Sequence, residues 1–549
     1  MRKTVLALMA ALIASPSWSD TLIQNINGIQ VGTDGKIEQF DALLIGDDGR
    51  VINIFRPEAD YTVPTGVNVI DGKGRSVLPG LIDAHGHVLG LGFSALQLDL
   101  VGTTSLDDLK QRLRAYAAAH PDARWIIGGG WNQELWPVKQ FPTAADLDSV
   151  VSDRPVVLER VDGHAIVVNS AAMKGAGVTP ETKSPPGGRI ENGLFVDNAR
   201  SLIEKAVPAA TPRENDRALA KAQEILLSYG VTGVGSMSTS LADWQAMRRA
   251  GEAGRLNVRL MVYADGLEPL RAEPHPTPWL YGERLRMGGV KFYADGALGS
   301  RGAWLKQPYA DKSDTRGIPR HSDPELLSLA LQAADKGFQI AIHAIGDAAN
   351  AQVISTYEQL SRKYGTNRRW RIEHFQIADP ADIPRLAPAG IIASMQPTHQ
   401  TSDRLMAEKR LGPNRLAGAY AWQTVLKSGA KLAFGTDFPV ESPNPFPGLS
   451  AAISRQDMEG QPPGGWIPSE RLTFEQALQA YTRSAAYAGF AEDKIGSLEP
   501  GKWADFVIVD RDPTKVDPQS LARTQVLETW IAGKKIWERT PSAVTERGK

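Results

Sequence analysis

The stretch LIDAHGHV (81–88) places two histidines directly after an apolar, strand-like run. Strand alternation turns His85 and His87 to the same side, and Gly86 between them leaves room for close approach. One His-x-His motif is weak evidence, because two polar residues in a loop would look the same. The position of this motif after an apolar run makes a metal-binding role worth testing elsewhere in the chain.

Four later segments repeat this arrangement of an apolar run followed by a polar group. The segments are VKFYADG (290–296), AIHAIGD (341–347), RIEHFQ (371–376) and AFGTDFP (433–439). They carry Lys291, His343, His374 and Asp437. A chance arrangement of this kind is improbable, so the six residues are candidate ligands of one divalent metal site.

The middle of the chain alternates apolar, strand-like runs with amphipathic stretches. The candidate strands span 77–85, 231–237, 258–264, 287–296, 338–346, 370–376, 390–396 and 431–437. Apolar runs that alternate with helices are typical of parallel strands covered by helices. Eight such units predict an α/β fold of the (β/α)8 TIM-barrel type, with functional groups at the carboxyl ends of the strands.

The two ends of the chain differ from this pattern. Residues 20–75 and 491–549 consist mainly of short β-type runs separated by Gly and Asp turns, and neither end has strands enough for a sound sandwich alone. We therefore predict a small β-sandwich built jointly from both termini, around a barrel domain at 76–490. The interval of about 90–228 is too long for one crossover helix. It predicts an inserted α/β subdomain that acts as a substrate lid.

Residues 1–19 read as a secretory signal peptide. A basic start, an apolar stretch from Val5 to Ala14 and small residues at Ser17 and Ser19 fit cleavage before Asp20. Ten apolar residues cannot cross a bilayer, which requires roughly 20. An uncleaved anchor is the alternative. We expect a periplasmic or secreted protein with no membrane attachment after cleavage.

Composition narrows the partners. Loss of Arg2 and Lys3 with the signal peptide leaves 59 of the 61 basic residues against 62 acidic ones, so no field attracts nucleic acid. The chain has no cysteine, which leaves histidine and carboxylate as metal ligands. The expected partner is a small-molecule substrate, and a homodimer is the default assembly.

Taken together, the motifs VLPGLIDAHGH, VKFYADGALGSR, AIHAIGD, IEHFQ and GTDFP resemble the amidohydrolase superfamily. With GGWNQELW (129–136), DGHAIVVNS (162–170) and SLEPGKWADFVIVD (497–510), they look most like its amidohydrolase-3 (YtcJ-like) branch, which includes N-substituted formamide deformylase. The resemblance covers 22–540 and is not specific for a substrate.

The resemblance implies a role for each candidate ligand. His85 and His87 would bind one metal ion with Asp437, and His343 and His374 would bind a second. Lys291 would bridge both ions as an N6-carboxylated lysine. The alternative is an unmodified lysine that neutralises Asp295 or Asp437, in which case the site could hold a single metal ion. Zn²⁺ is the expected metal, although other divalent ions suit a mixed nitrogen and oxygen site.

The implied reaction is hydrolysis of a non-peptide C–N bond in an amide, formamide or N-acyl amine. Water activated by the metal would attack the carbonyl, and Asp437 would act as general base and then as general acid. Two alternatives remain. The first is hydrolysis of an ester, lactone or cyclic imide on the same scaffold, and the second is a non-catalytic exported binding protein.

Four further residues are candidates for substrate contact, each with an ordinary structural alternative. His164 lies in a motif of the branch, and His399 follows the seventh predicted strand; either could instead serve packing. Arg301 could pair with a substrate carboxylate or cap a loop. Trp131 could form the wall of an apolar pocket or belong to a core.

Overall fold

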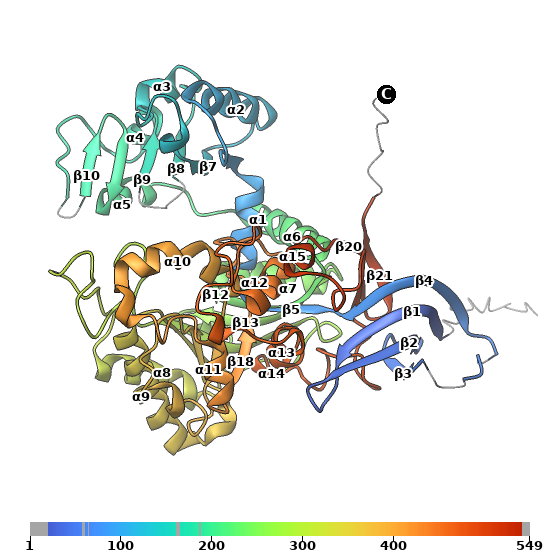
Figure 1. Ribbon diagram of the computed structural model, residues 1–549. Helices are drawn as coiled ribbons and strands as arrows, with labels where there is room; N and C mark the ends of the chain where they lie inside the picture. The colour runs from blue at the N-terminus through green and yellow to red at the C-terminus, as the bar shows by residue number, and fades with distance from the viewer. Residues whose placement is uncertain (1–19, 58–60, 64, 161–164, 186–187, 541–549) are drawn as a thin grey trace, which may run out of the picture.

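The computed structural model describes residues 20–540 except 58–60, 64, 161–164 and 186–187 (Figure 1). Eight parallel strands form its barrel sheet. They follow one another around the sheet in chain order. The strands are β5 (Leu81–Gly86), β12 (Val231–Thr239), β13 (Arg259–Asp265), β14 (Leu285–Tyr293), β15 (Gln339–Ala344), β16 (Arg371–His374), β17 (Ile392–Met395) and β18 (Lys431–Phe434). The predicted TIM-barrel fold class is confirmed.

Helices cover the outside of this barrel. They are α6 (Pro212–Ser228), α7 (Leu241–Glu252), α8 (Asp323–Asp335), α9 (Asp347–Tyr364), α10 (Pro397–Leu411), α11 (Trp422–Lys427), α12 (Pro445–Ser454), α13 (Phe474–Ala480) and α14 (Arg483–Ala488). The sequence sets their starts: α6 begins with Pro212 after a reciprocal Thr211–Glu214 capping box. No helix within the described ranges has both the length and the apolarity to cross a membrane.

The barrel is closed between its last and first strands by a side chain and two backbone bonds. The buried carboxylate of Asp83 accepts hydrogen bonds from the Thr436 amide at 3.1 Å and from the Thr436 hydroxyl at 2.7 Å. Just beyond, the amide of Asp437 donates to the His85 carbonyl at 2.8 Å, and the amide of His87 donates to the Phe438 carbonyl at 2.8 Å. These contacts fix Asp437 beside His85 and His87.

Strands from both ends of the chain join in one seven-stranded sheet. Its order is β21 (Lys534–Glu538), β20 (Val526–Ile531), β19 (Phe506–Val509), β4 (Asn68–Pro79), β1 (Thr21–Val31), β2 (Ile37–Ile45) and β3 (Val51–Phe55). The strand order gives one continuous sheet, so the two-layered sandwich stays a prediction. Residues 77–79, expected in the first barrel strand, pair instead with β19. The chain passes into β5 at Gly80, where a Cβ would lie 2.2 Å from the Thr232 hydroxyl.

A second α/β unit separates β5 from β12. Its six-stranded sheet has the order β10 (Gly188–Glu191), β11 (Leu194–Asp197), β9 (Ala165–Val168), β8 (Val156–Arg160), β7 (Ile126–Trp131) and β6 (Leu98–Asp99). Its helices are α2 (Leu106–Ala119), α3 (Ala144–Asp148), α4 (Ser170–Gly175) and α5 (Ser201–Glu204). We call this unit, about 97–207, the insert. It has its own apolar cores, separate from the main core of the barrel.

The insert is narrower than the predicted interval of about 90–228. Helix α1 (Val88–Leu96) and helix α6 pack on each other within the barrel's main core. They approach closely because Gly92 has no side chain: a Cβ there would lie 1.8 Å from the Ala218 carbonyl oxygen. Both ends of the predicted interval therefore belong to the barrel layer.

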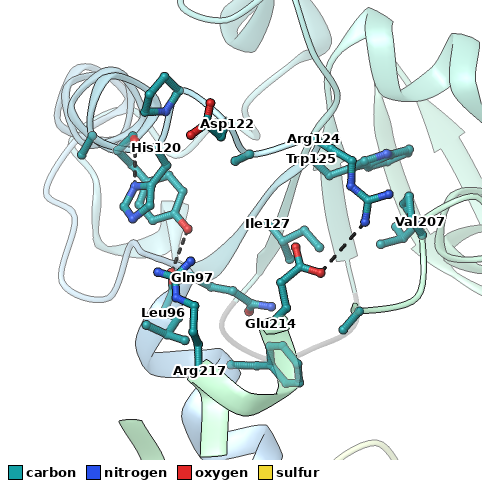
Figure 2. Close-up of a pocket in the computed structure, with 17 residues that line it drawn as sticks. Leu96, Gln97, His120, Asp122, Arg124, Trp125, Ile127, Val207, Glu214 and Arg217 are labelled. Carbon is teal, nitrogen blue, oxygen red and sulfur yellow. Dashed lines mark hydrogen bonds and ion pairs between the residues drawn. The ribbon is translucent and has the colours of Figure 1, made fainter. Parts of the chain in front are cut away.

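Two cavities lie where the insert joins the barrel. One of about 580 Å³ lies between α2 and the α1–α6 pair (Figure 2). There the Tyr116 hydroxyl donates to the Leu96 carbonyl at 2.7 Å, and Arg124 faces Glu214 at 4.0 Å. The other, of about 900 Å³, lies between the insert and the loop after β18. The second cavity, the interdomain cleft, is lined on the barrel side by Leu91 of α1 and by Pro439 and Val440, which follow Asp437 in the chain.

Candidate metal centre

The six predicted ligands all lie at or just beyond the carboxyl ends of barrel strands. His374 is the last residue of β16, and His85 and His343 are each the last residue but one of β5 and β15. Lys291 lies two residues before the end of β14. His87 follows β5 directly, and Asp437 is the third residue after β18. Parallel strands bring such positions to one end of a barrel. The chain therefore gathers residues that are separated by up to 352 positions in the sequence, from His85 to Asp437.

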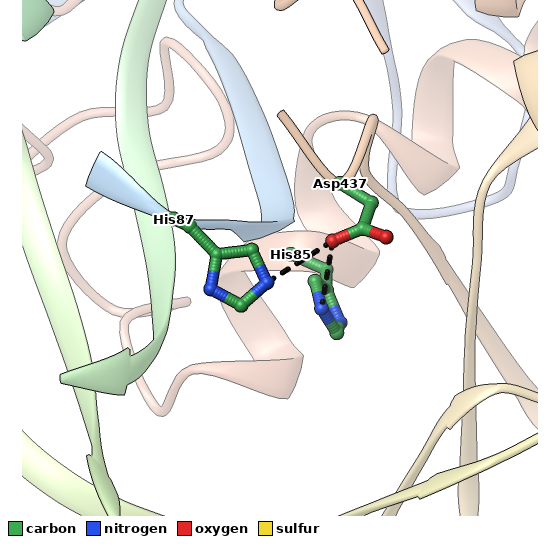
Figure 3. Close-up of side chains that lie close together, drawn as sticks. All are labelled: His85, His87 and Asp437. Carbon is green, nitrogen blue, oxygen red and sulfur yellow. Dashed lines mark ion pairs between the residues drawn. The ribbon is translucent and has the colours of Figure 1, made fainter. Parts of the chain in front are cut away.

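Asp437 is the centre of the cluster (Figure 3). Its Oδ1 lies 3.3 Å from His85 Nε2 and 3.2 Å from His87 Nε2. The two imidazoles thus face the same side, as the strand alternation predicts. Gly86 is required between them because a Cβ there would lie 2.3 Å from the Phe438 ring.

The backbone is strained at two of these ligand positions. His374 has φ 77° and Asp437 has φ 60°, both in the left-handed region that non-glycine residues rarely adopt. Such conformations cost on the order of 1–3 kcal/mol and persist where the surrounding structure imposes them. Here the strain turns both side chains towards the centre of the barrel mouth.

A buried ion pair orients His85 from below. The Glu373 carboxylate accepts a hydrogen bond from His85 Nδ1 at 2.6 Å and two from Arg371, at 2.7 and 3.0 Å. Burial alone would raise the pKa of Glu373, but the Arg371 charge and these hydrogen bonds lower it to about 2. The carboxylate stays ionised and holds the His85 proton on Nδ1, which leaves the Nε2 lone pair directed at the site.

The histidines of the second set are held neutral. Burial, reinforced by the Lys291 charge, lowers the pKa of His343 to about 3. Burial likewise holds the pKa of His374 well below its usual value. His374 Nδ1 donates to Gln396 Oε1 at 2.9 Å, so its Nε2 is available as an electron-pair donor. Neutral imidazole is the form that binds metal ions.

Asp295 anchors the loop beside His343. Its carboxylate accepts hydrogen bonds from the amides of Ile345, Gly346 and Trp304 at 2.8–3.0 Å, and one oxygen lies 3.5 Å from His343 Nε2. Burial outweighs these bonds and raises the pKa of Asp295 to about 7. Through these hydrogen bonds Asp295 connects the residues after β15 with the long loop after β14.

Lys291 is almost fully buried at the base of the site. Its Nζ lies 4.5 Å from the centre of the Tyr293 ring. Burial has the largest influence on the amine and lowers its pKa. The negative charges of Glu373 and Asp437 raise this pKa, but by less than burial lowers it. The lowered pKa favours the neutral amine that reaction with CO₂ requires.

The polar atoms around Asp437 fit a metal ion. His85 Nε2, His343 Nε2, His399 Nε2 and Asp437 Oδ1 are buried, and within the described chain none has a hydrogen-bond partner. A buried unpaired polar atom costs about 1–3 kcal/mol, so four such atoms in one cluster favour the binding of metal ions there. Histidine nitrogen and carboxylate oxygen are ligands suited to Zn²⁺ and related divalent ions.

The comparisons with known proteins agree with this chemistry. A family model described as "Amidohydrolase family" matches residues 68–536. The chain belongs to the amidohydrolase family. Membership makes it a hydrolase and implies a divalent metal and a small-molecule substrate.

Relatives of this amidohydrolase extend over nearly its whole length. YtcJ of Bacillus subtilis (strain 168) is 35% identical over 482 residues, which are 85% of this chain and 90% of YtcJ. N-substituted formamide deformylase of Arthrobacter pascens is 27% identical and covers 91% of this chain and 94% of its own. A crystal structure of an uncharacterized metal-dependent hydrolase from Pyrococcus horikoshii OT3 superposes with a TM-score of 0.79 at 29% identity, covering 91% and 99%. The resemblance to the amidohydrolase-3 branch is confirmed.

Of the four predicted substrate contacts of the amidohydrolase, one lies beside the metal-ligand cluster and two make other contacts. His399 lies in the first turn of α10, with Nε2 3.8 Å from Asp437 Oδ2. Arg301 instead pairs with Asp311 at 2.9 Å within its own loop. Trp131 is fully buried in the core of the insert, where its Nε1 donates to the Leu158 carbonyl at 2.9 Å, so it packs the insert and does not reach the cluster. His164 lies outside the described residues.

Three supporting residues of the amidohydrolase site escape sequence reasoning. Arg371 and Glu373 lie in a strand that reads as half polar, and only their complete burial reveals an ion pair. Asp83, in the LIDAHGHV motif, links β5 to the segment after β18 by accepting a hydrogen bond from the Thr436 hydroxyl. A charged residue inside an otherwise apolar run was the available signal for Asp83 alone.

Proposed function

We propose that this amidohydrolase is an exported enzyme that hydrolyses a non-peptide C–N bond of an amide, formamide or N-acyl amine. The observation that carries the proposal is the group of buried, unpaired nitrogen and oxygen atoms around Asp437. The relative named N-substituted formamide deformylase supports the substrate class. Export rests on residues 1–19, which lie outside the described residues.

The residues would hold one or two Zn²⁺ ions, and other divalent ions suit the same atoms. His85, His87 and Asp437 would bind one ion, while His343 and His374 would bind the second, with Lys291 between them as an N6-carboxylate. When bound, the metal supplies Lewis acidity, which polarises the substrate carbonyl and lowers the pKa of water.

Asp437 would move the proton in this reaction. Burial alone would raise the pKa of Asp437, but the nearby imidazoles of His85 and His87 outweigh it and hold this pKa well below its usual range. The ionised carboxylate accepts a proton from the attacking water. It then returns that proton to the leaving nitrogen, which must be protonated before it departs as an amine. Glu373 fixes the orientation of His85, and the strained backbone at residue 437 fixes the position of the Asp437 carboxylate.

The substrate would enter through the interdomain cleft. Its walls combine apolar residues with charged side chains such as Asp99, Arg160 and Glu204, and Val101 of the insert and Val440 of the barrel are 62% and 70% exposed. Val440 lies three residues after Asp437. An amide with an apolar substituent could cover both valines while its carbonyl reaches the cluster.

The proposed activity can be tested with matched substrates on metal-loaded enzyme purified from the periplasmic fraction. N-benzylformamide should be hydrolysed faster than the ester benzyl formate relative to their uncatalysed rates, because Asp437 can protonate a leaving nitrogen. Chelation should abolish turnover and lower the melting temperature, and Zn²⁺ should restore both. The chain should begin at Asp20. Preference for the ester would favour the alternative hydrolase, and absence of metal and turnover would refute the proposal.

Lys291→Ala should remove metal and activity together if the carboxylated lysine bridges two ions. Short carboxylic acids should then restore part of the activity, and the parent enzyme should lose activity when prepared without CO₂. Metal content and turnover measured side by side check this result. A parent enzyme indifferent to CO₂ would instead support an unmodified lysine.

A further inference from the structure

Asp437 presents its two carboxylate oxygens to two different groups of histidines. Oδ1 faces His85 and His87, and the other oxygen points away from both rings (Figure 3). That second oxygen, Oδ2, lies 3.8 Å from His399 Nε2. One ligand atom each of His374, His399 and Asp437 fall within 4.8 Å of one another, as they do for His85, His87 and Asp437. Asp437 therefore stands between two sets of three ligands.

His399 reaches this position from a helix and not from a barrel strand. Pro397 begins α10 directly after β17, which places His399 in its first turn. The imidazole lies parallel to that of His374, with ring centres 6.0 Å apart and planes at 14°. The side chain is largely buried, and its Nε2 has no hydrogen-bond partner among the residues described. A donor or acceptor so placed needs a ligand that the polypeptide does not provide.

The spacing fits metal ligands better than hydrogen bonds. A contact of 3.8 Å is too long for a hydrogen bond. Bonds of about 2.1 Å to a tetrahedral ion would separate its ligand atoms by about 3.4 Å. The contacts to the two oxygens of Asp437, at 3.2, 3.3 and 3.8 Å, lie on either side of that value.

We infer that His399 is a further ligand of the second metal ion, which it binds together with His374, beside Oδ2 of Asp437. The inference rests on the proposed metal-dependent function. It assigns His399 to metal binding and not to substrate contact, and it leaves Oδ2 of Asp437 for proton transfer. The Gln396–His374 hydrogen bond supports it, because that bond occupies Nδ1 and leaves Nε2 of His374 for the ion.

Metal titration of His399→Ala tests the assignment. Purified full-length mature enzyme is stripped and reloaded with Co²⁺, and bound metal per chain is measured together with the visible absorption of Co²⁺. His399→Ala should bind the second ion at least about tenfold more weakly and change the Co²⁺ spectrum. His399→Gln, which preserves side-chain bulk, should behave alike if the alanine variant folds poorly. His275→Ala, at an exposed loop histidine bonded to the Lys336 carbonyl, should match the parent.

The outcomes separate this inference from the proposed function. Unchanged metal content and an unchanged Co²⁺ spectrum in both His399 variants, with only KM raised, would overturn the inference and support substrate contact. The parent would still bind metal and hydrolyse amides in that case. A parent enzyme that neither binds metal nor hydrolyses amides would instead refute the proposed function, and with it the inference about His399.

Discussion

Asp437→Asn is expected to lower kcat on the order of 10³-fold, within the range that positioned general acid–base groups supply. The amide cannot accept the proton from water, and its neutral oxygen is a weaker metal ligand than the carboxylate that faces His85, His87 and His399. The fold should survive, because the backbone bond from residue 437 to the His85 carbonyl does not involve the side chain. Turnover, metal content and melting temperature should be measured on one preparation.

The matched control for this prediction is Asp314→Asn. Asp314 is an exposed carboxylate in the long loop after β14, so its loss should leave turnover within a few-fold of the parent. If Asp437→Asn kept more than a few per cent of parent turnover with full metal content, the proton-transfer role of Asp437 would be wrong.

Arg371→Met is expected to destabilise the fold by about 3–5 kcal/mol, the cost of leaving a buried charge without its partner. Arg371 is 1% exposed and donates to Glu373, to the Tyr263 hydroxyl, to the Ala84 carbonyl and to Ser394. Its removal leaves the Glu373 carboxylate in the barrel interior with only His85 as a partner. Urea and thermal unfolding measure the loss.

Two further variants separate this effect from a general loss of arginine. Arg301→Met removes a partly exposed pair with Asp311 and should cost less than about 1 kcal/mol. Arg371→Met combined with Glu373→Gln should recover part of the stability, because no buried charge is then unpaired. Equal destabilisation by Arg371→Met and Arg301→Met would contradict the proposed importance of the buried pair.

Local sequence was sufficient for the barrel and for the residues at its mouth. All eight candidate strands form the barrel sheet in the predicted order. The positions of His85 and Asp437 followed from one rule, because parallel strands bring their carboxyl ends together. A polar group that ends an apolar run is visible without knowledge of any distant neighbour.

Features that depend on distant neighbours could not be read in this way. Residues 77–79 look like the start of a barrel strand, yet they pair with β19 from the other end of the chain. The edges of the insert were misjudged because the pairing of α1 with α6 depends on close approach at Gly92. His399 was predicted near the substrate, but its distance to Asp437 is set by the start of α10. Each case needs three-dimensional contacts between segments that are remote in sequence.

The sheet built from both chain ends has a consequence for the order of folding. Strand β4 pairs with β1 on one side and with β19 on the other, so one of its edges waits for a partner near the end of the chain. During synthesis, β1 to β4 emerge first and present that edge unpaired while the whole barrel is still being made. An open strand edge is a template for aggregation. That edge of β4 is covered only after the barrel strands between β4 and β19 have been made, so the sheet is completed after the barrel has been synthesised.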